Sequence, residues 1–223
     1  ALIRIGEAPS AVHNNCSGKH AGFIAVARHL GVPVAGYVGA GHPVQQRVTA
    51  ALADLTGERL EGAVMGTDGC SIPTFGIPLT QLALAFARVA TGVGLSAERA
   101  RAAARLRAAV AKAPFHVAGS GRFDTKVMQR LGERVFCKVG AEGVFCAALP
   151  EQGLGVAIKV DDGNNARAAE VVMAAVIEAL VRLSADERVF IRGLSDVTLK
   201  NWNGIEVGAL RATAELRTAF AQT

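Results

Sequence analysis

The stretch VFCKVGAEGVFCAALPEQGLGVAIKVDDG, residues 135–163, decides the fold class. Three mostly apolar runs with β-branched and aromatic members lie near 134–139, 143–149 and 154–160. The connections GAEG and PEQG are short and contain glycine, which is typical of strands that follow one another in an antiparallel sheet. We therefore expect a three-stranded antiparallel meander in this part of the chain.

Apolar residues at helical spacing dominate the chain on both sides of this meander. We expect helices over residues 19–30, 43–55, 79–91, 97–113, 123–131 and 165–183. Residues 66–78 follow no period and are interrupted by glycine and proline, which predicts a loop. We expect the tail from 189 to 207 to be extended, so that it can supply an edge strand. Helices packed on an antiparallel sheet indicate the α+β class, in a single domain over residues 1–223.

The composition argues against several classes of protein. The chain has no run of roughly 18 apolar residues, the length that a membrane-spanning helix needs. Its net charge of +5 hints at a polyanionic partner, but the cations are scattered, and one Trp and one Tyr offer little for base stacking. We therefore expect neither a nucleic-acid nor a membrane partner. Four cysteines without a preceding secretory signal indicate free thiols or metal ligands in a cytoplasmic protein, rather than disulfides.

A second dense stretch, HNNCSGKHAGF at residues 13–23, contains Cys16 and Lys19, and Cys70 lies far along the chain in the turn that follows Asp68. Thiolates on glycine-rich loops suit zinc. A paired CxxC motif is missing, however, so two free cysteines remain the alternative. Lysine is a rare ligand because its amine must be neutral to bind a metal. A lysine in a first helical turn is slightly unfavourable with respect to the helix dipole, which hints at another role.

The tripeptide Lys138-Val139-Gly140 ends the first run of the predicted meander. A lysine on an edge strand followed by glycine lets a substrate lie close to the backbone while the amine faces a nucleophile. This is similar to the K-T-G element of serine β-lactamases and penicillin-binding proteins, where the strand, its hairpin partner and a C-terminal helix follow in the same order. A lone KxG is common, and a surface lysine before a turn is the alternative. Glu142 lies in the next turn as a solvated residue or a base. Arg122 and Asp124 can bind a carboxylate and an amine, or cap the short helix that follows.

The blocks HNNCSGKHAGF, GTDGCSIPTFGIPL and KVGAEGVFCAAL, in this order, resemble the asparaginase II family typified by the rhizobial inducible asparaginases. The resemblance spans essentially the whole chain. It implies a serine β-lactamase-like fold, a homodimer, and hydrolysis of L-asparagine to aspartate and ammonia. It also implies a zinc ion beside the active site, held by Cys16, Lys19 and Cys70, with Lys138 as the catalytic lysine.

Several further side chains near these blocks are candidates for contacts with the substrate. They are Asn15, His20, Asp68, Arg122 and Glu142.

The sequence departs from the family pattern at the nucleophile. In the family this serine belongs to an S-x-x-K motif upstream of CSGKH, and no serine of this sequence is followed by lysine three residues later. We therefore expect the chain, which does not begin with Met, to be the C-terminal two thirds of a larger domain and to hydrolyse asparagine poorly alone. The alternatives are an inactive zinc-binding or dimerisation module and a hydrolase that uses Cys16 or Cys70. For Cys16 only His13 and His20 are close in sequence as a partner.

Overall fold

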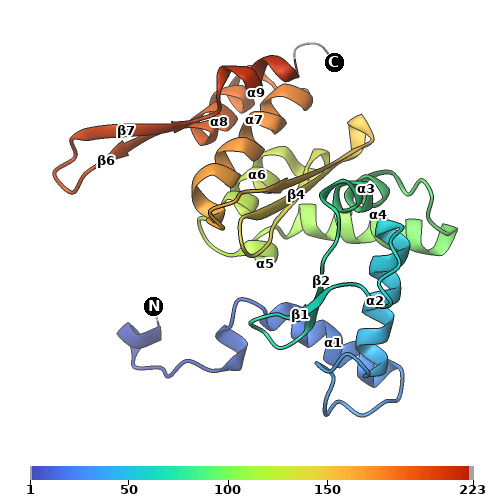
Figure 1. Cartoon of the computed structure of the whole chain (residues 1–223). Helices are drawn as coiled ribbons and strands as arrows, with labels where there is room; N and C mark the ends of the chain where they lie inside the picture. Colours follow the sequence, from blue (N-terminus) through green and yellow to red (C-terminus); the bar gives the residue numbers. More distant parts are fainter. Residues whose placement is uncertain (1, 221–223) are drawn as a thin grey trace. The chain divides into compact units, whose positions relative to one another are not determined.

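The computed structural model describes residues 2–220 (Figure 1). Contacts divide the chain into two compact units, one ending at Ile77 and the other beginning at Pro78. Helices and small antiparallel sheets make up the described residues, which confirms the predicted α+β class. The single domain and the serine β-lactamase-like arrangement stay predictions.

The first unit contains two α-helices and a short hairpin. The bounds in chain order, beginning with two 3-10 turns, are Leu2–Ile5, Ala11–His13, α1 (Ser17–His29), α2 (Pro43–Thr56), β1 (Met65–Thr67) and β2 (Pro73–Phe75). Helix α2 starts at His42, whose Nδ1 accepts a hydrogen bond from the Val44 N–H at 3.2 Å. It ends at Gly57, whose left-handed backbone (φ 77°) favours glycine.

The hairpin shows that the loop prediction for residues 66–78 was wrong in part. Strands β1 and β2 pair antiparallel, with Met65 opposite Phe75 and Thr67 opposite Pro73. Proline is tolerated here because both strands of a two-stranded sheet are edge strands. Each strand has only three residues, too few for an alternation of apolar and polar side chains to appear in the sequence.

The second unit is built on the predicted meander, whose strands are β3 (Phe136–Val139), β4 (Val144–Leu149) and β5 (Leu154–Lys159). They form one antiparallel sheet in the order β3-β4-β5, with Cys137 opposite Ala147 in the first pair. The three strands predicted from the sequence are thus confirmed. The central strand β4 is buried along almost its whole length.

Helices cover this sheet and supply most of the core. Their bounds are α3 (Leu79–Thr91), α4 (Ala97–Lys112), α5 (Phe115–Ala118), α6 (Phe123–Leu131), α7 (Glu170–Leu180), α8 (Ala185–Ser195) and α9 (Ala214–Ala219). The fully buried core side chains include Val127, Met128, Phe145, Met173, Ile177 and Ile191, from α6, β4, α7 and α8. Burial of each side chain of this size contributes about 1.5–3 kcal/mol relative to exposure. Among residues 2–220, each helix is too short or too polar to cross a lipid bilayer.

Two sequence predictions for the C-terminal part need correction. The helix expected over 165–183 is a π-helical turn at 165–169 followed by α7, and the tail expected to be extended from 189 is helical up to Ser195. The helix α8 forms because Ser184 and Glu187 make a capping box, in which each side chain accepts a hydrogen bond from the other residue's N–H. The strands β6 (Asp196–Lys200) and β7 (Glu206–Arg211) then pair with each other and add no edge to the central sheet.

Candidate metal and active site

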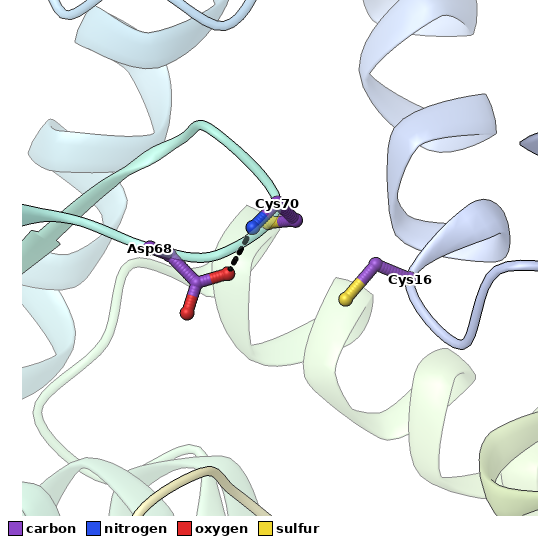
Figure 2. A group of neighbouring side chains, drawn as sticks. All are labelled: Cys16, Asp68 and Cys70. Atoms are coloured by element: carbon purple, nitrogen blue, oxygen red, sulfur yellow. Dashed lines mark hydrogen bonds between the residues drawn. The ribbon is translucent and has the colours of Figure 1, made fainter.

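Three side chains of the first unit converge on one point. The sulfur atoms of Cys16 and Cys70 and a carboxylate oxygen of Asp68 all lie within 4.8 Å of one another, and all three residues are half-buried. Figure 2 shows the Cys16 side chain pointing from the start of α1 toward the loop that carries the other two. The structure thus brings together two thiols that lie far apart in the sequence, and it adds a carboxylate to them.

The turn between β1 and β2 fixes the position of Asp68 and Cys70. The Asp68 N–H donates to the carbonyl of Ile72 at 2.9 Å, and the Ser71 N–H donates to the carbonyl of Asp68 at 2.8 Å. The Asp68 carboxylate in turn accepts the Cys70 N–H at 3.0 Å, and this bond is drawn in Figure 2. Ser71 takes a left-handed backbone (φ 77°), which is uncommon for a residue with a side chain. The turn therefore presents both ligand candidates on the same side of the short hairpin.

The start of α1 supplies the other side of the cluster. Cys16 is the N-cap residue of this helix, and its N–H donates to the side-chain oxygen of Asn14 at 2.8 Å. The positive end of the helix dipole favours a negatively charged ligand at this position. One turn later, Lys19 donates from Nζ to the Cys70 sulfur at 3.2 Å. Lys19 thus contacts one of the two cysteines, and whether it binds a metal stays a prediction.

The charges around the cluster suit a divalent cation. The pKa of Asp68 is lowered, first because the Cys70 thiol and N–H donate to its carboxylate, and also because Lys19 is positively charged. Two thiolates and this carboxylate, set against one protonated lysine, would leave two negative charges uncompensated. A zinc ion carries the charge that balances them.

The spacing of the side chains fits a zinc ion as well. Zinc–sulfur bonds of about 2.3 Å in a tetrahedral site place two sulfur ligands ~3.8 Å apart. The three candidate ligand atoms lie within 4.8 Å of one another, a limit that includes this separation. Two thiolates are also ligands that favour zinc over the hard cations magnesium and calcium.

The neighbouring candidates His20 and Asn15 make different contacts. The His20 ring is bonded through Nδ1 to the Tyr37 hydroxyl at 2.6 Å and packs edge-on against Phe23 and Tyr37. Its Nε2 atom is buried and has no partner among the described residues. Asn15 is exposed in the turn before α1. Tyr37 was not singled out in the sequence, because no local pattern links a lone tyrosine to a histidine 17 residues away.

The remaining candidates belong to the second unit. Lys138 lies on β3, is exposed, and donates from its amine to the Val139 carbonyl. Glu142 occupies the β3–β4 turn with a left-handed backbone (φ 54°). Arg122 is the residue before α6, and its positive charge partly offsets the rise in the pKa of Glu170 that burial causes. The roles predicted for these side chains stay predictions.

Asp124, a candidate for amine binding or helix capping in the sequence, is a buried carboxylate in contact with the end of β3. The residue is only 1% exposed, and its Oδ1 accepts the Val139 N–H at 2.7 Å, which ties α6 to the end of β3. The second carboxylate oxygen, Oδ2, is buried without a hydrogen-bond partner among residues 2–220. Asp124 therefore fixes the backbone position of the residue that follows Lys138.

The other two cysteines are core residues, as their place in the strands predicts. Cys137 is fully buried, and burial raises the pKa of its thiol well above the ordinary value. Burial also raises the pKa of the Cys146 thiol to about 12. Both thiols therefore stay protonated and unreactive at neutral pH.

Comparison with known proteins covers both units of the chain. The family model described as L-asparaginase II matches residues 1–212. The matched residues include the Cys16/Asp68/Cys70 cluster, Lys19 and Lys138. A search of curated proteins finds no match to this chain.

Proposed function

The chain belongs to the L-asparaginase II family, and on this premise we propose that it acts in the hydrolysis of the side-chain amide of L-asparagine to L-aspartate and ammonia. The observation that carries the proposal is the metal-compatible cluster of Cys16, Asp68 and Cys70 inside a match that spans most of the chain. We further propose the serine β-lactamase-like arrangement and the homodimer that the sequence resemblance implies.

We assign zinc to the cluster, held by Cys16, Lys19 and Cys70, with Asp68 as the alternative to Lys19. Both are within reach, since the Lys19 amine donates to Cys70 and Asp68 is close to both sulfurs. A bound zinc ion supplies positive charge that can orient a substrate or polarise its amide oxygen.

We assign Lys138 the role of an electrostatic or proton-transfer group. Its amine is exposed at the end of β3, and Asp124 holds the adjacent N–H of Val139, so that the strand end is fixed where a substrate would bind. Amide hydrolysis through an acyl intermediate also needs an activated nucleophile. No serine in the sequence is followed three residues later by the lysine of an S-x-x-K motif. We therefore expect the 223-residue chain alone to release little ammonia.

The test measures ammonia release from L-asparagine by the 223-residue chain and by the protein of the complete gene, together with their zinc content. Lys138→Met in the active protein should lower kcat by about 10²–10⁴-fold, as expected for a positioned proton-transfer group. Lys159→Met is a matched control, because Lys159 also ends a strand and donates to the carbonyl that follows it, at 2.6 Å.

Each outcome discriminates between the alternatives. Zinc binding without turnover in the protein of the complete gene would indicate a non-catalytic metal module. Turnover that survives Lys138→Met but is abolished by alkylation or replacement of Cys16 or Cys70 would indicate a thiol-dependent hydrolase. Equal losses in Lys138→Met and Lys159→Met would remove the specific role of Lys138.

A further inference from the structure

The β3–β4 turn, residues 140–143, is held at both ends by the side chain of Asn165. The Asn165 Nδ2 atom donates to the Gly140 carbonyl at 2.9 Å, and its Oδ1 atom accepts the Gly143 N–H at 2.7 Å. Asn165 is half-buried and begins the π-helical turn that leads into α7. Short π-helical segments are frequent at functional sites. One amide thus ties the turn to another part of the second unit.

The chemistry of an amide suits this bridge. A backbone carbonyl only accepts and a backbone N–H only donates, so the side chain between them must offer one donor and one acceptor. An aspartate would offer two acceptors and set one of them against the Gly140 carbonyl. The neighbouring Asn164 has a different task, because its Oδ1 atom accepts the N–H groups of Ala166 and Arg167 at 2.9 and 3.1 Å and so caps the helical turn. The two adjacent asparagines therefore form a matched pair for comparison.

The bridge lies next to the peptide group that holds the Lys138 amine. This amine donates to the Val139 carbonyl. The preceding peptide group is anchored to α6, because the Val139 N–H donates to Asp124 at 2.7 Å. The following peptide group is anchored to Asn165 through the Gly140 carbonyl. Peptide groups are planar and move by rotation about φ and ψ, so anchors on both sides fix the carbonyl that receives the amine.

The contacts inside the turn do not hold its conformation as firmly. The Gly140 N–H donates to the Val144 carbonyl at 2.8 Å, a single bond about which the strand end can still pivot. Glu142 has a left-handed backbone (φ 54°), and such strain persists where surrounding contacts impose it. Asn165 supplies these contacts, because it holds Gly140 and Gly143 at a fixed separation.

We propose that Asn165 is a positioning residue, which keeps the Lys138 amine in place by fixing the β3–β4 turn. The proposal rests on the role in amide hydrolysis proposed above for Lys138. Asn165 acts through the turn and leaves the proton transfer itself to the lysine. Misplacing a reacting group by about 1 Å can cost roughly 10²-fold in rate, so loss of the bridge should lower kcat rather than raise KM.

The first experiment measures the Lys138 amine in the 223-residue chain and needs no activity. Brief acetylation with acetic anhydride, read by mass spectrometry, gives the labelling rate of Lys138 relative to that of Lys159, whose amine donates to the Val160 carbonyl at 2.6 Å. Asn165→Asp should raise this ratio by about 2- to 10-fold, the factor that loss of one hydrogen bond produces in an equilibrium. Asn165→Ala should do the same without a change of charge. Asn164→Asp introduces the same charge one residue earlier, keeps the helix cap and should leave the ratio unchanged.

The second experiment measures ammonia release by the protein of the complete gene. Asn165→Asp should lower kcat by about 10²-fold with little change in KM, and Asn164→Asp should leave both unchanged. Because Asn165 acts through Lys138, Asn165→Asp combined with Lys138→Met should lose no more activity than Lys138→Met alone.

The outcomes separate this inference from the proposed function. Unchanged labelling of Lys138 in both Asn165 variants overturns the inference, whatever the activity. So does a loss of kcat in Asn165→Asp that multiplies with the loss in Lys138→Met. Full activity in Lys138→Met, together with labelling that responds to Asn165, refutes the catalytic role of Lys138 and supports the hold on its amine.

Discussion

Replacing Lys19 by methionine should reveal which side chain completes the metal site. The Lys19 amine donates to the Cys70 sulfur at 3.2 Å, and a carboxylate oxygen of Asp68 lies within 4.8 Å of both cysteine sulfurs. A lysine must lose its proton before it can bind zinc. The Asp68 carboxylate is already ionised at neutral pH, because hydrogen bonds from Cys70 and the charge of Lys19 lower its pKa. The two ligand sets therefore differ in the number of protons that zinc displaces.

The expected difference is about one proton. At pH 7 an ordinary thiol is mostly protonated, so zinc binding through Cys16, Lys19 and Cys70 should release about three protons, and binding through Cys16, Asp68 and Cys70 about two. Lys19→Met should lower the number released by about one and weaken zinc binding by more than 10-fold. Asp68→Asn should leave the number unchanged and weaken binding by about 10-fold, as is typical when a group beside a metal ligand is removed.

Calorimetric titration of zinc in buffers of different ionisation enthalpy counts the protons, and a competing chelator measures the affinity. Cobalt substitution gives an independent check, because thiolate ligation produces a charge-transfer band that both variants should retain. Cys16→Ser should lose this band in part and serves as the control for ligand loss. A Lys19→Met protein that binds zinc as tightly as the unaltered chain, with the same proton release, refutes the assignment of Lys19 and leaves Asp68 as the third ligand.

Three further predictions concern the second unit. Gly155→Ala should destabilise the chain by roughly 3 kcal/mol or more in urea unfolding, because a Cβ there would lie 1.9 Å from a backbone oxygen of α3. Gly193→Ala is the control: a Cβ on this residue of α8 would meet no atom within 4 Å, and the variant should be more stable by about 0.5–1 kcal/mol. Arg134 lowers the pKa of Glu187 to about 2 from 4.5, so the ion pair's contribution is fully present above pH 4.5 and is lost as the pH falls toward 2. The stability difference between the unaltered chain and Glu187→Gln should thus shrink over that interval from about 1–3 kcal/mol. Asp124→Ala should cost about 1–3 kcal/mol of unfolding free energy, because it leaves the partly buried Val139 N–H of β3 without its acceptor. Asp124→Asn keeps an acceptor and should cost less, and equal losses in the two variants would contradict this.

The central sheet could be predicted from the sequence because its signals are local. The connections GAEG and PEQG are short, and residues 135–163 place three apolar runs in direct succession, so that neighbouring strands can pair only as a meander. The position of α3 on this sheet could not be predicted in the same way. It depends on Gly155, where the helix backbone approaches so closely that no side chain fits, and nothing in the surrounding sequence marks this glycine as a contact point.

The C-terminal part of the chain shows how a local signal can be present and still be outweighed. Ser184 and Glu187 form a capping box, which predicts a helix start, but the apolar spacing from 189 onward also suits an extended chain. The expectation of one extended tail over residues 189–207 overlooked Asn203-Gly204, a dipeptide typical of hairpin turns, and the strands on either side of it pair with each other. The sequence could not decide whether these strands pair with each other or with the central sheet, because both arrangements would use the same residues.

The four cysteines illustrate which part of the candidate site follows from residue type and which part needs the fold. All four are chemically alike in the sequence, and the CxxC spacing that would single out two of them is missing. The fold separates them by burial. Cys137 and Cys146 are surrounded by the core, and the raised pKa values of their thiols keep them neutral. Cys16 and Cys70 are half-buried, beside the carboxylate of Asp68 and the amine of Lys19, where a charged thiolate has partners. The environment therefore favours metal binding at the first pair over the second, a distinction that spacing in the sequence does not make.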